Sequence, residues 1–164
     1  MKKVEQDFLI KIEKHKGILF KISKMYMDYR EDQEDLFQEI VLQIWKAYPS
    51  FERKSQFSTW MYRIALNTAI ISLKKEKRTP FISPIEELEN LRHPIDFSTD
   101  QKEEQISKMY KAIHELNPIE KAIIFYYLED YSGKEIAENM GISEVNARVK
   151  LNRAKQKLKE LISK

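Results

Sequence analysis

Apolar side chains recur at spacings of three and four residues along the first half of the chain, which is the pattern of amphipathic helices. The first such stretch covers residues 5–27. Its apolar face is predicted to consist of Phe8, Ile12, Leu19, Ile22 and Tyr26. A second helix is predicted from Asp32, taken as its N-cap, to Tyr48, because Pro49 ends it. A third is predicted over residues 57–75, after a polar loop. Its apolar side chains are Phe57, Trp60, Met61, Ile64, Ala65 and Ile71.

The C-terminal part of the chain repeats this spacing in four shorter stretches. The first ends at Asn117, which is predicted to cap a second helix that has Pro118 at its first position. Ser132 and Glu135 form a capping box at the start of a third helix, because each side chain can bind the other residue's backbone amide. The last helix is predicted to start at Ser143. Its buried face is predicted to be Ala147, Leu151, Ala154 and Leu158.

No stretch alternates apolar and polar residues over the length of a strand, so the fold class is predicted to be all-α. Residues 79–101 contain three prolines and five acidic residues among scattered apolar ones, which is typical of a linker. We therefore expect two small helical domains, residues 1–80 and 102–164, joined by an acidic, proline-containing linker at 81–101. The formal charges are +5 and +2 for the domains and −4 for the linker, so a basic domain lies at each end.

The composition argues against several classes of enzyme. The chain of 164 residues has no cysteine and only three glycines, so it has neither a thiolate metal site nor a glycine-rich phosphate loop. Its histidines, His15, His93 and His114, lack the spacing of a zinc site. We expect no catalytic activity, metal, cofactor or small-molecule substrate. No apolar run approaches the roughly 20 residues of a membrane span, which favours a cytoplasmic protein.

The last two predicted helices meet at Gly141 in a short turn, which is the arrangement of a helix-turn-helix. Ala137 is small where the helices cross, and the glycine permits a left-handed backbone. The outer face of the last helix carries Arg and Asn, which can pair with guanine and adenine edges. Residues 148–164 hold seven bases and one acid, which favours contact with phosphates. A purely structural hairpin would share the glycine and the alanine, so both interpretations stay open on this motif alone.

Two parts of the chain resemble conserved regions of one family, the bacterial sigma factors. The run Asp35-Leu36-Phe37-Gln38-Glu39, followed by Trp45, and the run FSTWMYRIALN at 57–67 resemble the second conserved region. The capping box with EIAE at 135–138 and GIS at 141–143 resembles the fourth region. Having these two regions in this order, with only a short linker, resembles the extracytoplasmic-function (group four) sigma factors.

This resemblance implies roles for two sets of residues in the first domain. In the family, the helix with the D-L-x-Q-E run binds core RNA polymerase. The matching positions here are Asp35, Gln38 and Glu39. The loop before the third helix, together with that helix, captures an unstacked base of the minus-ten promoter element. The matching positions here are Phe51, Arg53, Lys54, Ser55, Trp60, Tyr62, Arg63 and Asn67. Because Trp60 and Tyr62 are two residues apart and cannot share a helix face, we expect Trp60 to be the core residue of the two.

The same resemblance implies that the last helix reads the minus-thirty-five element as duplex DNA. The matching positions are Asn146, Arg148, Val149, Lys150, Asn152 and Arg153. Val149 replaces a small polar residue that is common in the family, so we expect it to contact a thymine methyl group. The implied function is that of a sigma factor whose partners are core RNA polymerase, promoter DNA and an anti-sigma factor, which in this family is often anchored in the membrane.

A stand-alone helix-turn-helix repressor is the alternative interpretation. Such a protein would bind DNA without polymerase and would need no basic, aromatic-rich first domain, so Trp60, Tyr62 and Asn67 disfavour it. A helical adaptor that binds only another protein remains an alternative if the last helix does not bind nucleic acid.

Overall fold

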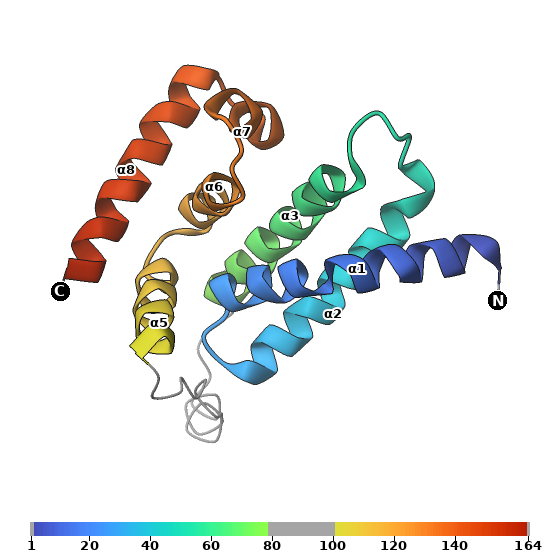
Figure 1. The fold of residues 1–164 in the computed structure, drawn as a ribbon, viewed down its shortest axis with the longest axis horizontal. Helices are drawn as coiled ribbons and strands as arrows, with labels where there is room; N and C mark the ends of the chain where they lie inside the picture. Colours follow the sequence, from blue (N-terminus) through green and yellow to red (C-terminus); the bar gives the residue numbers. More distant parts are fainter. Residues whose placement is uncertain (1, 79–100, 164) are drawn as a thin grey trace. The chain divides into compact units, whose positions relative to one another are not determined.

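The structure, a computed structural model, describes the backbone of residues 2–78 and 101–163. The regular elements within these residues are all helices, which confirms the predicted all-α fold (Figure 1). The chain divides into two compact units, Met1–His93 and Pro94–Lys164. The predicted acidic linker, apart from Gln101, lies outside the described residues, so its limits and those of the flanking domains stay predictions.

Three helices pack against one another in the first unit. They are α1 (Lys3–Tyr26), α2 (Arg30–Ala47) and α3 (Phe57–Arg78), and the short 3-10 helix η1 (Tyr48–Ser50) follows α2. The predicted apolar face of the first helix is confirmed, because all five of its residues are buried. α2 adds to this core Leu36, Ile40 and Ile44.

The start of α2 differs from the predicted one. Its N-cap is Tyr29, whose side chain makes no capping hydrogen bond, so the prediction that Asp32 caps this helix is wrong. The buried side chain of Gln33 explains the difference, because its Nε2 donates to the carbonyl oxygen of Met27 at 2.8 Å. The amide of Gln33 also donates to the carbonyl oxygen of Tyr29 at 2.9 Å. These bonds fix the turn after α1 and let α2 begin at Arg30, which leaves Asp32 in the first helical turn.

The buried face of α3 also differs from the predicted one. Tyr62 is 5% exposed whereas Trp60 is only half-buried, so the prediction that Trp60 is the core residue is wrong. Buried positions follow one helix face, which comprises Met61, Tyr62, Ala65, Leu66 and Ala69. Trp60 instead contacts aromatic rings around the end of α2. Ile71, which the apolar pattern included, is 56% exposed.

The second unit is formed by α5 (Gln101–His114), α6 (Pro118–Leu128), α7 (Gly133–Met140) and α8 (Glu144–Ser163). α8 contacts each of the other three helices. The face predicted for the last helix is confirmed at three of its four positions, because Leu151 is half-buried and the others are buried.

The predicted helix caps of the second unit are confirmed. Asn117 and Ser132 each accept a hydrogen bond from the backbone amide three residues later, at 2.8 Å and 3.1 Å. The carboxylates of Glu120 and Glu135 accept the return bonds from the cap amides, so two capping boxes are complete. Ser143 caps α8 by accepting a hydrogen bond from the amide of Asn146 at 3.1 Å. Hydrogen bonds from the Ser132 backbone and side chain lower the pKa of the Glu135 carboxyl group.

Candidate nucleic-acid interface

Four aromatic side chains meet where α2 ends and α3 begins. We call Tyr48, Phe51, Phe57 and Trp60 the aromatic cluster. The ring centroid of Phe51 lies 4.9 Å from that of Trp60 and 5.6 Å from that of Phe57. Tyr48 joins them with its centroid 6.2 Å from Phe57 and 6.5 Å from Trp60. These are the separations of interacting rings. Because all four side chains are half-buried, the cluster also offers ring surface to solvent.

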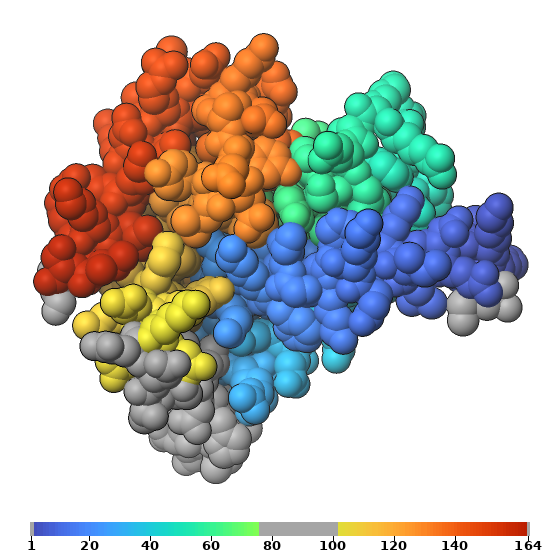
Figure 2. Space-filling model, in the orientation of Figure 1, coloured from blue at the N-terminus to red at the C-terminus, as the bar shows by residue number. Residues whose placement is uncertain are grey.

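The loop of residues 51–56 joins η1 to α3 and starts within this cluster. Figure 2 shows that this part of the first unit protrudes from its surface. Arg53, Lys54 and Ser55 are exposed, and Lys54 forms an ion pair of 2.9 Å with Glu52. Arg53 has a φ of +60°, in the left-handed region that few residues other than glycine adopt. The loop therefore places basic and polar groups beside partly exposed aromatic rings.

One face of α3 continues from the cluster. Trp60, Arg63 and Asn67 are spaced by three and four residues, so they lie on one side of the helix. The side chains of Arg63 and Asn67 are exposed. Tyr62 is on the opposite side, in the core. Of the eight positions expected at the minus-ten element, the structure places Tyr62 in the core, whereas the other seven lie in the aromatic cluster, in the loop and on the outer side of α3.

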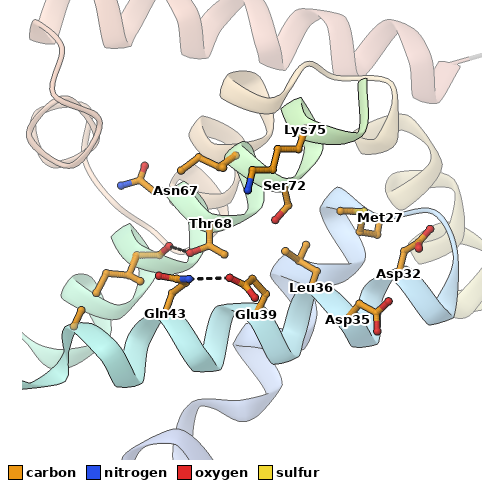
Figure 3. A pocket seen from close by; sticks show the side chains of 13 residues that line it. Met27, Asp32, Asp35, Leu36, Glu39, Gln43, Asn67, Thr68, Ser72 and Lys75 are labelled. Carbon is orange, nitrogen blue, oxygen red and sulfur yellow. Dashed lines mark hydrogen bonds between the residues drawn. The ribbon is translucent and has the colours of Figure 1, made fainter. Parts of the chain in front are cut away.

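A groove of about 750 Å³ runs between α2 and α3. Asp35 and Glu39 of α2 line it together with Asn67 of α3, so residues from two expected sites share one groove. Figure 3 shows Glu39 and Gln43 of α2 facing Thr68 of α3. The Gln43 side-chain amide donates to the Glu39 carboxylate at 2.8 Å.

The positions expected to bind polymerase lie on the exposed side of α2, where Asp35 and Glu39 border the groove and Gln38 lies outside it. Asp35, Gln38 and Glu39 are all exposed. Leu42 follows Gln38 by four residues on the same face and is 43% exposed. Sequence reasoning missed Leu42, although an apolar residue outside the buried stripe of α2 was a signal for it.

The turn between α7 and α8 has the geometry of a helix-turn-helix. Gly141 has a φ of +70°, and the amide of Ile142 donates to the carbonyl oxygen of Ala137 at 3.1 Å. Ile136, Ala137 and Ala147 are buried, whereas Ile142 is half-buried. Small residues at 137 and 147 fit the close contact of α7 with α8.

The outer face of α8 presents most of the predicted DNA-reading residues. The exposed ones are Asn146, Arg148, Val149, Asn152 and Arg153, and Lys150 is half-buried. Arg148 forms an exposed ion pair with Glu144 at 3.6 Å. Val145 is 68% exposed, four residues before Val149 on the same face, and sequence reasoning missed it.

Lys150 and Arg153 differ from the other basic residues of α8 in their surroundings. Together with the first turn of α6 they line a groove of about 330 Å³. The groove is also lined by Glu120, whose carboxylate accepts a hydrogen bond from the Asn117 amide, so the side chains of Lys150 and Arg153 supply its positive charge. One turn further along α8, Lys157 pairs with Glu120 of α6 at 3.3 Å. The basic stripe of α8 is therefore divided between an outer face and an edge next to α6.

Within the part of the chain that the structure describes, no group of three or more His, Asp or Glu side chains could hold a metal ion. Over the same residues, no helix is long and apolar enough to cross a membrane.

Comparison with protein families matches both units. Residues 12–79 match the Sigma-70 region 2 family, and residues 106–158 match the Sigma-70, region 4 family. The structure also resembles the sigma factor RpoE from Bartonella quintana in its complex with the anti-sigma factor NepR. That fold has a TM-score of 0.71 at 19% identity and covers 96% of this chain and 98% of the other. CnrH, solved in complex with the cytosolic domain of CnrY, has a TM-score of 0.65 at 18% identity, with 97% and 89% coverage.

Sequence relatives agree with these matches. The ECF RNA polymerase sigma factor SigG of Mycobacterium tuberculosis is 31% identical over 153 residues, which cover 77% of this chain; the chain spans only 41% of that relative's length. The ECF RNA polymerase sigma-E factor of Haemophilus influenzae is 32% identical over 143 residues. The match covers 81% of this chain and 76% of that relative. By these matches, the chain belongs to the ECF family of RNA polymerase sigma factors.

Proposed function

We propose that the chain is a sigma factor that binds core RNA polymerase and directs it to promoters. The observation that supports this most directly is that one chain carries both a loop beside partly exposed aromatic rings and a basic recognition helix. The first suits unstacked DNA and the second suits duplex DNA. The chain supplies binding energy and position, whereas the polymerase performs nucleotidyl transfer.

We propose that the first unit binds the minus-ten element and polymerase on neighbouring surfaces. The ring surfaces of Phe51 and Trp60 would stack on an unstacked base, and the loop cations would contact the strand's phosphates. Asn67, whose amide can donate and accept, would contact a base edge further along α3. Asp35, Gln38, Glu39 and the exposed Leu42 would contact polymerase. The proposed limits are residues 1–80 for this region, 81–101 for the linker and 102–164 for the second region.

We propose a division of labour along α8. Val145 and Val149 would contact thymine methyl groups, while Asn146, Arg148 and Asn152 would read base edges. Lys150 and Arg153, beside the first turn of α6, would contact phosphates and so fix the register of the helix on the duplex.

We further propose an anti-sigma factor as a partner of this chain and the cytoplasm as its place of action. The support for this partner is that the Bartonella quintana sigma factor, whose fold is similar to that of this chain, was solved in complex with the anti-sigma factor NepR. Polymerase and promoter DNA are in the cytoplasm, which is why we place the function there.

Transcription in vitro tests this proposal. The chain is added to core polymerase on sheared genomic DNA from the bacterium that encodes it, and transcript starts are sequenced with and without it. New starts that share two upstream elements are expected. Tight DNA binding without polymerase, and no new starts, would instead support the repressor. Binding to polymerase alone, with no new starts, would contradict the proposed promoter reading.

A further inference from the structure

Lys11 of α1 ends inside the aromatic cluster, although α1 is outside every surface assigned above. Its Nζ donates a hydrogen bond to the Tyr48 hydroxyl at 3.0 Å. The same nitrogen lies 5.3, 5.5 and 5.2 Å from the ring centroids of Tyr48, Phe51 and Phe57. A cation within about 6 Å of a ring is attracted to its face. One ammonium group therefore contacts rings from η1, the loop and α3.

A second residue of α1, His15, also contacts the aromatic cluster. His15 lies one turn after Lys11, and its Nδ1 is 2.8 Å from the Lys11 carbonyl oxygen. Its ring centroid is 5.6 Å from that of Phe57. The two side chains share one helix face, so α1 contacts the cluster at two successive turns.

We propose that Lys11 is a positioning residue for capture of the minus-ten strand. It holds Phe51, the residue from which the loop starts, against the other rings and so fixes where Arg53, Lys54 and Ser55 stand. Without the ammonium the rings lose a shared partner, and the loop must be ordered when the strand binds, which weakens binding. This inference rests on the proposed role of the loop.

The experiment uses holoenzyme assembled from the full chain and core polymerase. Two probes are compared by fluorescence anisotropy: a labelled single strand with the minus-ten region of a promoter located by the transcription experiment, and a labelled duplex with its minus-thirty-five region. Lys11→Met keeps the apolar stem and removes the charge. Lys11→Arg keeps a cation, and Lys14→Met removes an exposed charge one turn away on α1 as the matched control.

We expect Lys11→Met to weaken single-strand binding about tenfold and to leave duplex and polymerase binding unchanged. Lys11→Arg should retain most of the affinity, and Lys14→Met should match the unchanged chain.

A second measurement needs no DNA and reports how well the aromatic cluster is packed. In a Trp45→Phe background, Trp60 is the only tryptophan. Lys11→Met should then make its fluorescence more accessible to acrylamide, whereas Lys14→Met should not.

Single-strand affinity of Lys11→Met equal to that of the unchanged chain would overturn the proposal, as would an equal loss on both probes or an equal loss for Lys14→Met. If Lys11→Met does not fold, Tyr48→Phe takes its place, because it removes only the hydroxyl, and a smaller loss on the single strand alone is expected. A holoenzyme with native Lys11 that binds the minus-ten strand no better than a scrambled strand would refute the loop's proposed role, and the inference about Lys11 with it.

Discussion

The two candidate DNA interfaces of this chain are built in different ways. In the second unit, the helix-turn-helix is set by residues close in sequence: the Ser132 capping box, the left-handed Gly141 and the Ser143 cap. In the first unit, side chains of α1 meet a continuous stretch formed by η1, the loop and the start of α3, which lies much further along the sequence. A locally specified interface depends on backbone chemistry, whereas an assembled one depends on side chains that meet only after folding.

The residues with a positive φ in the two units agree with this contrast. The left-handed position of the helix-turn-helix is a glycine, which adopts that conformation without steric cost. In the loop of the first unit the left-handed residue is Arg53, for which it is unfavourable. Arg53 therefore adopts a conformation that costs free energy, two residues after Phe51 of the aromatic cluster.

Truncation of the cluster tests the assembled interface. Trp60→Ala should lower the free energy of unfolding of the first unit by about 2–3 kcal/mol, less than for a fully buried aromatic residue because Trp60 is half-buried. Hydrogen exchange of the full chain, followed by mass spectrometry, should show faster exchange in α1 to α3 and unchanged exchange in α8. An equal acceleration in both units would mean that they are not independent.

Substitutions on α8 test the local interface. Arg148→Ala should weaken duplex binding by about 1–3 kcal/mol and relax specificity at one base position. Lys150→Ala should weaken all duplexes alike and reduce the slope of affinity against salt by about 1. Titration of matched and single-substituted promoter duplexes at several salt concentrations separates the two effects. Lys111→Ala, exposed on α5, serves as the control, and exchanged phenotypes for Arg148 and Lys150 would contradict the proposed division.

The capping box gives a pH-dependent test of local specification. Ser132→Ala should destabilise the second unit by about 1 kcal/mol at neutral pH. The folded pKa of Glu135 is lowered from 4.5, so its stabilising contribution is present above that value and is lost as the pH falls through the folded pKa. The variant keeps the Ser132 backbone amide, which lowers the pKa of Glu135 most, and loses only the hydroxyl. The difference in free energy of unfolding between Ser132→Ala and the unchanged chain should therefore be constant near neutral pH and narrow only in part below about 4.5. Urea unfolding across this pH range measures this difference in free energy of unfolding. A difference that becomes larger in acid would contradict the prediction.

The smallest effect is expected from relief of strain in the loop. Arg53→Gly should raise the free energy of unfolding by about 0.5 kcal/mol, because glycine removes the steric cost of a positive φ but adds backbone entropy to the unfolded chain. It should also weaken single-strand binding, since a loop cation is lost. Asp130→Gly is the matched control at a φ of +65°, and because aspartate tolerates this region better, its gain should be smaller. Thermal unfolding of both variants measures the two gains in stability, and a larger gain for Asp130→Gly would contradict the prediction.

Prediction from sequence was most successful where a signal is local. Asn117, Ser132, Gly141 and Ser143 act through groups within four residues of themselves, and each was placed correctly. It failed at Asp32 because the buried Gln33, through its bond to Met27, decides where α2 begins. It failed at Trp60 because helical spacing gives relative directions of side chains without saying which of two faces meets the core.

The candidate sites show the same limit. Spacing placed Arg148 and Asn152 on an outer face without any knowledge of the other helices, and the family resemblance supplied their expected role. No spacing rule relates Lys11 to Phe51, and none separates Lys150 from Arg148 by their surroundings.

The amino-acid sequence was enough to predict an all-helical chain, its division into two helical units, the caps of the second unit and its helix-turn-helix. Each of these depends on the periodicity or hydrogen bonding of neighbouring residues. The packed fold was needed to show that Tyr62 is buried in place of Trp60, that Asp35 and Glu39 share a groove with Asn67, and that Lys11 lies among the aromatic rings. These outcomes depend on which helix faces meet, and that is set by the packing of side chains distant in sequence.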